Sequence, residues 1–253
     1  MIEWLSQAVS QQGALALAIL AGASLVRAAF GFGDALIAMP LLAMLIGVRD
    51  ATGLVGLAGM SLSILMLWNE RQAVDFRGAW RLILASCMGI PVGLHFLKHG
   101  DERIVKFVLS AVIIGFSLFK LLRPALGRLK SDNAAFLFGF CAGVLGGAYN
   151  SDGPPLVIYG SLKRWSPQAF RATLAGIFAT TGWAILIGQA SAGLWTANVM
   201  QLYVLALPLV AAAALIGKAL HRVLPPGKFD FCIHAMLIVI GAGLLADVVR
   251  ALA

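Results

Sequence analysis

Long apolar segments alternate with short polar stretches along the whole chain. Ten apolar segments can be delimited, at residues 13–26, 36–48, 51–68, 82–97, 104–122, 134–148, 154–162, 172–189, 199–218 and 231–249. A helix needs about 20 apolar residues to cross a bilayer, and the stretch 172–217, which holds no charged residue, is long enough for two such helices. The pattern therefore predicts an all-α, polytopic membrane protein.

The composition agrees with this prediction. Charged residues make up 12% of the chain and hydrophobic residues 60%, whereas soluble domains contain about 25% charged residues. The net charge of +8 comes from Lys and Arg in short loops, where they set orientation and meet anionic lipid headgroups. We therefore expect the lipid bilayer, and not nucleic acid, as the partner of this charge. Cys87, Cys141 and Cys232 are widely separated, which is no disulfide or metal pattern, so we expect them to pack inertly.

The two halves of the chain match each other at a nearly constant offset. Asp34 and Asp152 are 118 positions apart, and Pro91 and Pro208 are 117 apart, which indicates an internal duplication. The division that follows is an N-terminal membrane repeat at 1–122, a cytoplasmic linker at 123–133 and a C-terminal membrane repeat at 134–253. Because each repeat has about five hydrophobic segments, an odd number, we expect two inverted repeats that lie in opposite senses across the membrane.

Positive charge in the short loops predicts the orientation. The linker, the loop at 162–171 and the stretch at 218–228 are basic, whereas 189–198 carries no charge. We therefore expect the basic loops and the loop at 69–81 in the cytoplasm, and Met1 outside. No basic region precedes the first apolar segment, so we expect no cleaved signal peptide.

Glycine and proline interrupt the apolar pattern at two matching places. The first motif reads Phe-Gly-Phe-Gly-Asp at 30–34, and the second reads Tyr-Asn-Ser-Asp-Gly-Pro-Pro at 149–155. Proline suits the first turn of a new helix, and irregular backbone at membrane depth is tolerated only inside protein or beside a cavity. We expect each motif to carry a broken helix or a re-entrant pair, and whether 36–48 and 154–162 cross or re-enter stays open. The alternative is close helix packing, which we prefer for other glycines such as Gly56.

Asp34 and Asp152 are the candidate functional carboxylates. An ionisable group at the bilayer centre costs about 3 kcal/mol on insertion scales, so each one suggests a function. Three roles stay open for them, namely carrying protons, binding a sodium ion and pairing with a cation. Arg27 lies seven residues before Asp34, on the same face if the helix continued, and we interpret it as a ligand of an anion or as the partner of Asp34.

Helix N-termini created by the two breaks would favour an anion, because their free amides carry partial positive charge. The candidate substrate-binding residues are Arg27, Gly31, Gly33, Ala35, Tyr149, Asn150, Ser151, Gly153, Pro154 and Thr180, and the candidate ion-coupling residues are Asp34 and Asp152. The chain has no HExxH, no GxSxG and no close His/Asp grouping. We therefore expect no catalytic residue, no metal and no cofactor, and we do not interpret the chain as an enzyme.

The Phe-Gly-Phe-Gly motif running into Met-Pro-Leu-Leu at 39–42, with a second Gly/Pro motif after the linker, resembles the sulfite exporter TauE/SafE family of sulfonate-uptake-type permeases. The resemblance covers essentially the whole chain. It implies a multi-pass transporter of the prokaryotic inner or plasma membrane for a small, often sulfur-containing anion such as sulfite or a sulfonate. Asp34 and Ala35, and the run at 150–152, stand where this family commonly has glycine. A carboxylate repels an anion, so these departures favour coupling to H⁺ or Na⁺.

The sequence thus predicts a secondary transporter of a small anion that works by alternating access, with proton or sodium coupling through Asp34 and Asp152. A passive anion channel and a transporter of a non-sulfur carboxylate are the alternatives. The transported anion, the direction of transport and the oligomeric state, with a homo-oligomer among the options, stay open.

Overall fold

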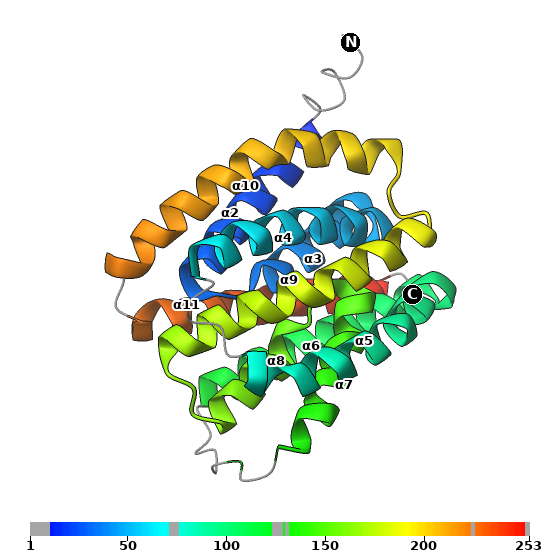
Figure 1. Ribbon diagram of the computed structural model, residues 1–253. Helices are drawn as coiled ribbons and strands as arrows, with labels where there is room; N and C mark the ends of the chain where they lie inside the picture. Colours follow the sequence, from blue (N-terminus) through cyan, green and yellow to red (C-terminus); the bar gives the residue numbers. More distant parts are fainter. Residues whose placement is uncertain (1–10, 71–75, 123–128, 130–131, 224–225, 251–253) are drawn as a thin grey trace.

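The computed structural model describes residues 11–70, 76–122, 129, 132–223 and 226–250, and these residues form ten α-helices and no strand (Figure 1). The helices are α2 (Gln11–Phe30), α3 (Asp34–Ile46), α4 (Val48–Glu70), α5 (Phe76–His99), α6 (Glu102–Leu122), α7 (Ala134–Tyr149), α8 (Gly153–Leu162), α9 (Pro167–Ser191), α10 (Ala197–Val223) and α11 (Pro226–Arg250). The all-α prediction is confirmed. Met1 and most of the linker lie outside the described residues.

Each predicted apolar segment falls on one of these helices, most of which extend beyond the predicted bounds, and one segment runs past the end of its helix. The segment expected at 36–48 was predicted two residues too long, because α3 ends at Ile46 and Val48 already opens α4. Gly47, between them, has a φ of 82°, a left-handed conformation that ends a helix and that glycine adopts without steric cost.

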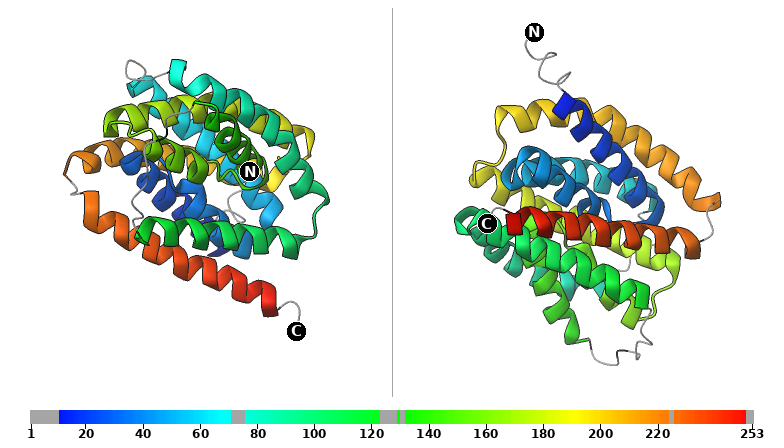
Figure 2. Two further views of the ribbon diagram at one scale, coloured as in Figure 1. Left: turned by 90° about the horizontal axis from the view of Figure 1, so that it is seen from below. Right: turned by 180° about the vertical axis from the view of Figure 1, so that it is seen from behind.

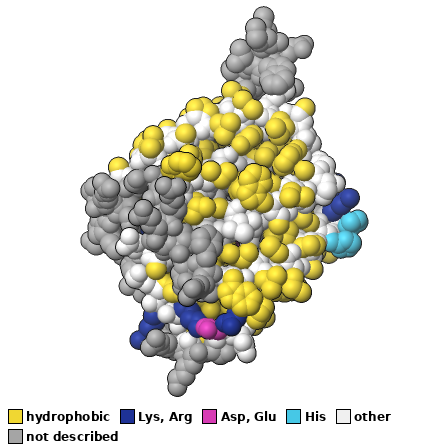
Figure 3. Space-filling model, viewed as in Figure 1, with side chains coloured by type: hydrophobic (Ala, Val, Ile, Leu, Met, Phe, Trp, Pro, Cys, Tyr) yellow, Lys and Arg dark blue, Asp and Glu magenta, His cyan; other side chains and the backbone are white. Residues whose placement is uncertain are grey.

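The outer surface of the bundle is suited to lipid. Among the described residues, seven helices (α2, α4, α5, α6, α9, α10 and α11) are long and apolar enough to cross a membrane. The helices α3, α7 and α8 have 13, 16 and 10 residues, fewer than the roughly 20 that a crossing helix needs. Large apolar side chains such as Trp68, Leu215 and Val239 are exposed, and Figure 3 shows hydrophobic side chains spread over a broad face with charged ones near its margins. The chain is therefore a multi-pass membrane protein.

Helices that lie side by side come from distant parts of the chain. Figure 2 shows α2 along α10 and α6 along α11, and these pairs are in extensive contact. The central helix α4 packs against α3, α9 and α10. The helix α3 is enclosed by α2, α4, α6 and α11, and its side chains Leu36, Met39 and Leu42 are buried. The first Gly-rich break is thereby held inside the bundle.

Polar contacts tie the helix ends together on two opposite sides. On one side, the exposed carboxylate of Asp132 pairs with Arg81 near the start of α5 and with Lys163, which follows α8. Lys163 and Arg81 lower the pKa of the Asp132 carboxyl below its ordinary value, because both favour its charged form. On the other side, Arg49 at the start of α4 donates a hydrogen bond to the carbonyl oxygen of Lys98 near the end of α5, at 2.9 Å.

The helices α5 and α7 approach each other through glycine. A Cβ atom on Gly143 of α7 would collide with the carbonyl oxygen of Ser86 on α5, and one on Gly93 would collide with the carbonyl oxygen of Val144. The Ser86 hydroxyl donates across the same interface to the carbonyl oxygen of Gly139, at 2.9 Å. Small residues allow such close approach of helices in membranes, so this pair forms a dense, specific contact.

We expect Gly143→Ala to lower the stability of the protein by about 1–3 kcal/mol, because the added methyl group overpacks the α5–α7 interface. Thermal unfolding of the purified protein in detergent measures this. The matched control is Gly115→Ala on α6, where an added Cβ meets no atom within 4 Å. Alanine is better than glycine in a helix by about 1 kcal/mol, so this control should unfold at the same or a higher temperature. Equal unfolding temperatures of the two variants would contradict the close α5–α7 contact.

Candidate functional site

The first break joins α2 to α3 and turns the chain back on itself. Gly31 and Gly33 have φ angles of 91° and 104°, in the left-handed region that glycine tolerates best. A Cβ on Gly31 would also crowd the Arg171 side chain, with a Cβ–Cγ distance of 3.1 Å. The break therefore requires glycine for both its conformation and its packing. It places Asp34, the first residue of α3, opposite Arg27 in the last turn of α2.

The second break joins α7 to α8. Asn150 ends α7 in a left-handed conformation with a φ of 54°, and its backbone N–H donates to the carbonyl oxygen of Gly146. The amide of Ser151 donates to the carbonyl oxygen of Leu145, which satisfies a second orphan carbonyl of the helix end. Asp152 precedes α8, whose first turn holds two prolines. Proline at this position lacks only an amide that the first turn leaves free in any case.

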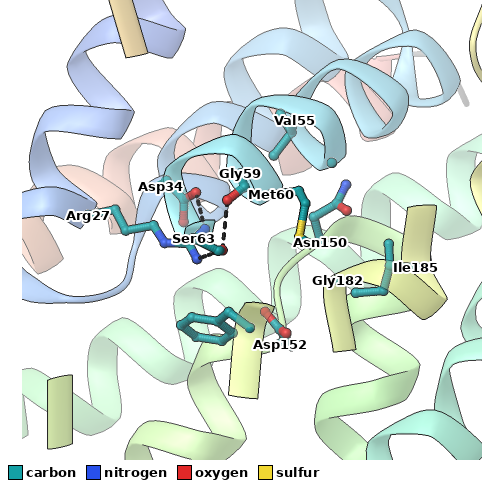
Figure 4. A pocket seen from close by; sticks show the side chains of 12 residues that line it. Arg27, Asp34, Val55, Gly59, Met60, Ser63, Asn150, Asp152, Gly182 and Ile185 are labelled. Carbon is teal, nitrogen blue, oxygen red and sulfur yellow. Dashed lines mark hydrogen bonds and ion pairs between the residues drawn. The ribbon is translucent and has the colours of Figure 1, made fainter. Parts of the chain in front are cut away.

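A small pocket lies between the two breaks (Figure 4). Residues of α2, α3, α4, α9 and the α7–α8 junction line it, and its free volume for water-sized occupants is about 30 Å³. Its polar side chains are Arg27, Asp34, Ser63, Asn150 and Asp152. The structure thus brings the two predicted carboxylates and the predicted cation to one cavity, although they come from three separate elements.

Arg27 is the central group on one side of this pocket, and only 6% of its surface is exposed. One guanidinium nitrogen, Nη1, lies 2.7 Å from Oδ2 of Asp34, and Nη2 donates to the Ser63 hydroxyl. The guanidinium also lies over the ring of Phe178, 4.8 Å from its centroid, which is a cation–π contact. Gly59 leaves room for the ion pair, since a Cβ there would lie 3.3 Å from Nη1. The Nε atom of Arg27 is buried and has no hydrogen-bond partner among the described residues.

Asp152 lies across the pocket from this cluster and is half-buried (Figure 4). Within the described part of the chain, its carboxylate forms no ion pair. The backbone of Gly146 lies behind it, so that a Cβ there would be 3.2 Å from the Cβ of Asp152. Ile185 and Gly182 of α9 line the pocket beside it. Asp152 is thus a carboxylate that faces a cavity without a cationic partner in contact.

Asn150 extends the polar side of the pocket toward α4 and α9. Its amide nitrogen donates to the carbonyl oxygen of Thr52 at 2.8 Å, and its oxygen accepts from Nε2 of Gln189 at 3.0 Å. Gln189 is fully buried, and its Oε1 has no hydrogen-bond partner among the described residues. A Cβ on Gly56 would collide with that amide. Gly56, which the sequence suggested as a packing residue, therefore also makes room at the pocket.

The other candidate residues are not part of the pocket lining. Those that do not line the pocket are Gly31, Gly33, Ala35, Tyr149, Ser151, Gly153, Pro154 and Thr180. The Tyr149 hydroxyl donates to the carbonyl oxygen of Val105 at 2.9 Å, and Thr180 is exposed with its hydroxyl bonded to Gly176 of its own helix. The geometry therefore gives no support for substrate contact by Thr180. The remaining residues belong to the breaks or to the helix turns beside them.

The sequence profile described as "Sulfite exporter TauE/SafE" matches residues 14–244, a range that contains both breaks and all the residues that line the pocket. The chain belongs to the TauE/SafE family. One curated relative, the probable sulfite/organosulfonate exporter TauE of Cupriavidus necator, is 27% identical over 244 residues, which cover 92% of this chain and 94% of the relative. No solved structure matches the chain. The resemblance seen in the Gly/Pro motifs is confirmed, and the TauE/SafE family consists of transporters rather than enzymes.

Arg171 is a residue of this TauE/SafE chain that sequence reasoning counted only as a loop charge. It lies inside α9 and is 8% exposed, and its guanidinium donates to the carbonyl oxygens of Ala28 and Ala29 at the end of α2. A cation at a helix C-terminus is stabilised by the free carbonyls there. In the sequence, the one indication that Arg171 belongs to a helix is its position directly before the uncharged stretch 172–217. Arg171 thereby fixes the end of the helix that carries Arg27.

We expect Arg171→Gln to lower the stability by about 2 kcal/mol, because hydrogen bonds from a charged donor to buried carbonyl groups are lost. Thermal unfolding in detergent is again the measurement. Gln168→Ala, an exposed change in the first turn of the same helix, should leave the unfolding temperature unchanged. A matching unfolding temperature for Arg171→Gln would show that the end of α2 does not depend on this contact.

Proposed function

We propose that this TauE/SafE protein is a secondary transporter that exports a small sulfur oxyanion, sulfite or an organosulfonate, across the plasma membrane, and that the pocket between the breaks is its binding site. The observation that carries the proposal is the buried Arg27 guanidinium in a cavity between two interrupted helices. A buried cation at membrane depth is costly and marks a substrate or ion pathway. The relative's name supplies the class of anion and the direction.

Arginine has the chemistry that an oxyanion requires. The guanidinium offers a planar set of N–H donors, is permanently charged and matches anions with several oxygens through paired hydrogen bonds. In this pocket, Phe178 and Ser63 hold its orientation. Asn150 and Ser63 add neutral hydrogen-bonding groups. These features support binding of a compact, multi-oxygen anion.

The inverted repeats, at 1–122 and 134–253 with the linker 123–133 between them, belong to the same proposal. Each half contains one interrupted pair, α2–α3 or α7–α8, followed by three long helices. The end of α3 lies beside the start of α4, which contacts the end of α5. The end of α8 lies near Asp132, which pairs with Lys163 and with Arg81 near the start of α5. Because these contacts are at the two ends of α5, they are consistent with α3 and α8 ending at opposite membrane faces. Two halves of opposite sense can rock about a shared site and expose it to each side in turn.

Asp34 and Asp152 are proposed as the two candidate groups through which anion movement is coupled to H⁺ or Na⁺, and either one can carry the cation. A pocket with one guanidinium and two carboxylates has no surplus positive charge for an anion. A cation that accompanies the anion would restore the balance, because net charge in a desolvated cavity is costly. Coupling through these acids explains why a carboxylate is compatible with an anion site.

Arg27→Gln should reduce counterflow exchange of radiolabelled sulfite in proteoliposomes by about ten- to a hundredfold, since a charge-assisted hydrogen bond contributes about 1.5–3 kcal/mol and each 1.4 kcal/mol is tenfold in affinity. The matched control is Arg103→Gln, which removes an exposed arginine at the start of α6. Equal exchange in the two variants would reject the pocket as the binding site, and absence of counterflow in the wild-type protein would identify a channel instead of a carrier.

The inverted arrangement makes a separate prediction about which membrane face each hairpin reaches. In a background with the three native cysteines replaced, Arg49→Cys should react with a membrane-impermeant maleimide added outside intact cells. Gln168→Cys should react only after permeabilisation, because α8 and the start of α9 are expected at the cytoplasmic face. Both positions are exposed in the structure. Labelling of both from the same face would rule out the inverted repeat.

A further inference from the structure

Asp34 occupies the place that a transported anion needs. The structure pairs its carboxylate with Nη1 of Arg27, and no other Lys or Arg among the described residues lines the pocket. A guanidinium whose charge is already neutralised binds a second anion weakly. The role of Asp34 in anion binding rests on the proposed function, in which the pocket receives a sulfur oxyanion.

The pocket has little free space beside the intact ion pair in this arrangement. Its free volume of about 30 Å³ is room for about two water molecules by the same measure. A sulfur atom with three oxygens requires more space than this. The unused Nε donor of Arg27 is buried, so an anion cannot reach it in this arrangement. We therefore expect the anion to compete with the Asp34 carboxylate for the Arg27 guanidinium.

If the anion replaces the Asp34 carboxylate at Arg27 and no other ion enters, the net charge of the pocket changes. The Arg27–Asp34 pair is neutral, and replacing the carboxylate by a monovalent anion leaves one unpaired negative charge on Asp34. An unpaired charge in a cavity with so little water is costly, and the carboxylate avoids that cost by binding a proton. One ion pair breaks, a guanidinium–oxyanion pair forms, and one proton moves from water to Asp34, so that the net charge is unchanged.

We infer that Asp34 is an internal competitor of the transported anion for Arg27, and that the anion enters the pocket together with one proton, which the displaced Asp34 accepts. Coupling then follows from the fact that a single guanidinium cannot pair with both groups. The empty carrier keeps the Asp34 carboxylate paired with Arg27, as in the present structure. The loaded carrier keeps Asp34 neutral and the anion on Arg27.

The groups around Asp34 are consistent with this assignment. The elements packed against α3 are α2, α4, α6 and α11. From α2 the facing group is Arg27, from α4 it is the neutral Ser63, and the α7–α8 junction presents Asp152 to the same pocket. On α6 and α11, His234 lies edge-on to Phe116, and Lys106 pairs with Asp247 near the ends of these helices. Among the described residues that line the pocket, Arg27 is therefore the cation that pairs with Asp34.

A proton suits this pocket better than a metal cation does. A bound metal ion needs several oxygen ligands at fixed distances, whereas a proton needs only the carboxylate itself. Much of the lining between the two acids is apolar, from Met60, Phe178 and Ile185. Asp152 has no ion pair with Arg27, so anion binding displaces nothing from it. The exchange therefore assigns the coupled proton to Asp34 and not to Asp152.

The test counts protons as an anion binds to the purified protein in weakly buffered detergent solution with a pH indicator. Methanesulfonate is the probe, because its sulfonate stays ionised throughout and contributes no proton. Wild-type protein and Asp152→Asn should each take up about one proton per methanesulfonate, and the affinity should fall about tenfold per pH unit as the pH rises, since one proton is linked to binding. In Asp34→Asn, binding should be tighter, independent of pH and free of proton uptake.

The outcomes separate the inference from the proposed function. Methanesulfonate binding to the wild-type protein without proton uptake, or with dependence on Na⁺ instead of pH, overturns the inference and leaves the oxyanion site standing. If Asp152→Asn still binds methanesulfonate but no longer takes up a proton, the inference is also overturned. This outcome does not depend on how much folded Asp34→Asn protein is obtained. Failure of both sulfite and methanesulfonate to bind the wild-type protein rejects the proposed function itself. Asp247→Asn, a carboxylate change outside the pocket, should behave as the wild type.

Discussion

A guanidinium buried at membrane depth must have an anionic partner at all times, and this constraint organises the centre of the molecule. Arg27 is almost fully enclosed by protein, where an unpaired charge costs several kcal/mol. The chain meets the constraint locally, because the Gly-rich break turns α3 back so that Asp34 reaches the last turn of α2. Ser63 and Phe178 hold the guanidinium from α4 and α9, and Arg171 holds the end of α2. In the proposed exchange, an anion that enters this site takes over the role of Asp34.

The two breaks use the same backbone device but carry different chemistry. Both interrupt an apolar helix with glycine or proline and place an aspartate at the start of a short second helix. At the offset that relates the two aspartates, however, Leu145 stands where the first half has Arg27. The pocket is consequently asymmetric, with an ion pair on one side and Asp152 beside Asn150 on the other. In the proposed inverted repeat, only one half would thus supply a cation to the shared site.

Much of this arrangement was accessible from sequence, because lipid leaves few structural options. Uncharged runs had to become helices, and the glycines and prolines at 31, 33, 154 and 155 had to end or begin them. The pairing of Arg27 with Asp34 could be suggested from their spacing, although they meet across a turn and not along one continuous helix. The role of Arg171 was not predictable, since its carbonyl partners lie about 140 residues away in the sequence. The outward position of Thr180 depends on the rotation of α9 in the bundle, which no local pattern specifies.

The most direct test of the exchange at Arg27 is an experimental structure of the protein in saturating sulfite at a resolution that places side chains. The account predicts the anion within hydrogen-bond distance of the Arg27 guanidinium, with the Asp34 carboxylate moved out of contact and the pocket enlarged. An anion bound elsewhere, with the 2.7 Å contact between Arg27 and Asp34 intact, would contradict it.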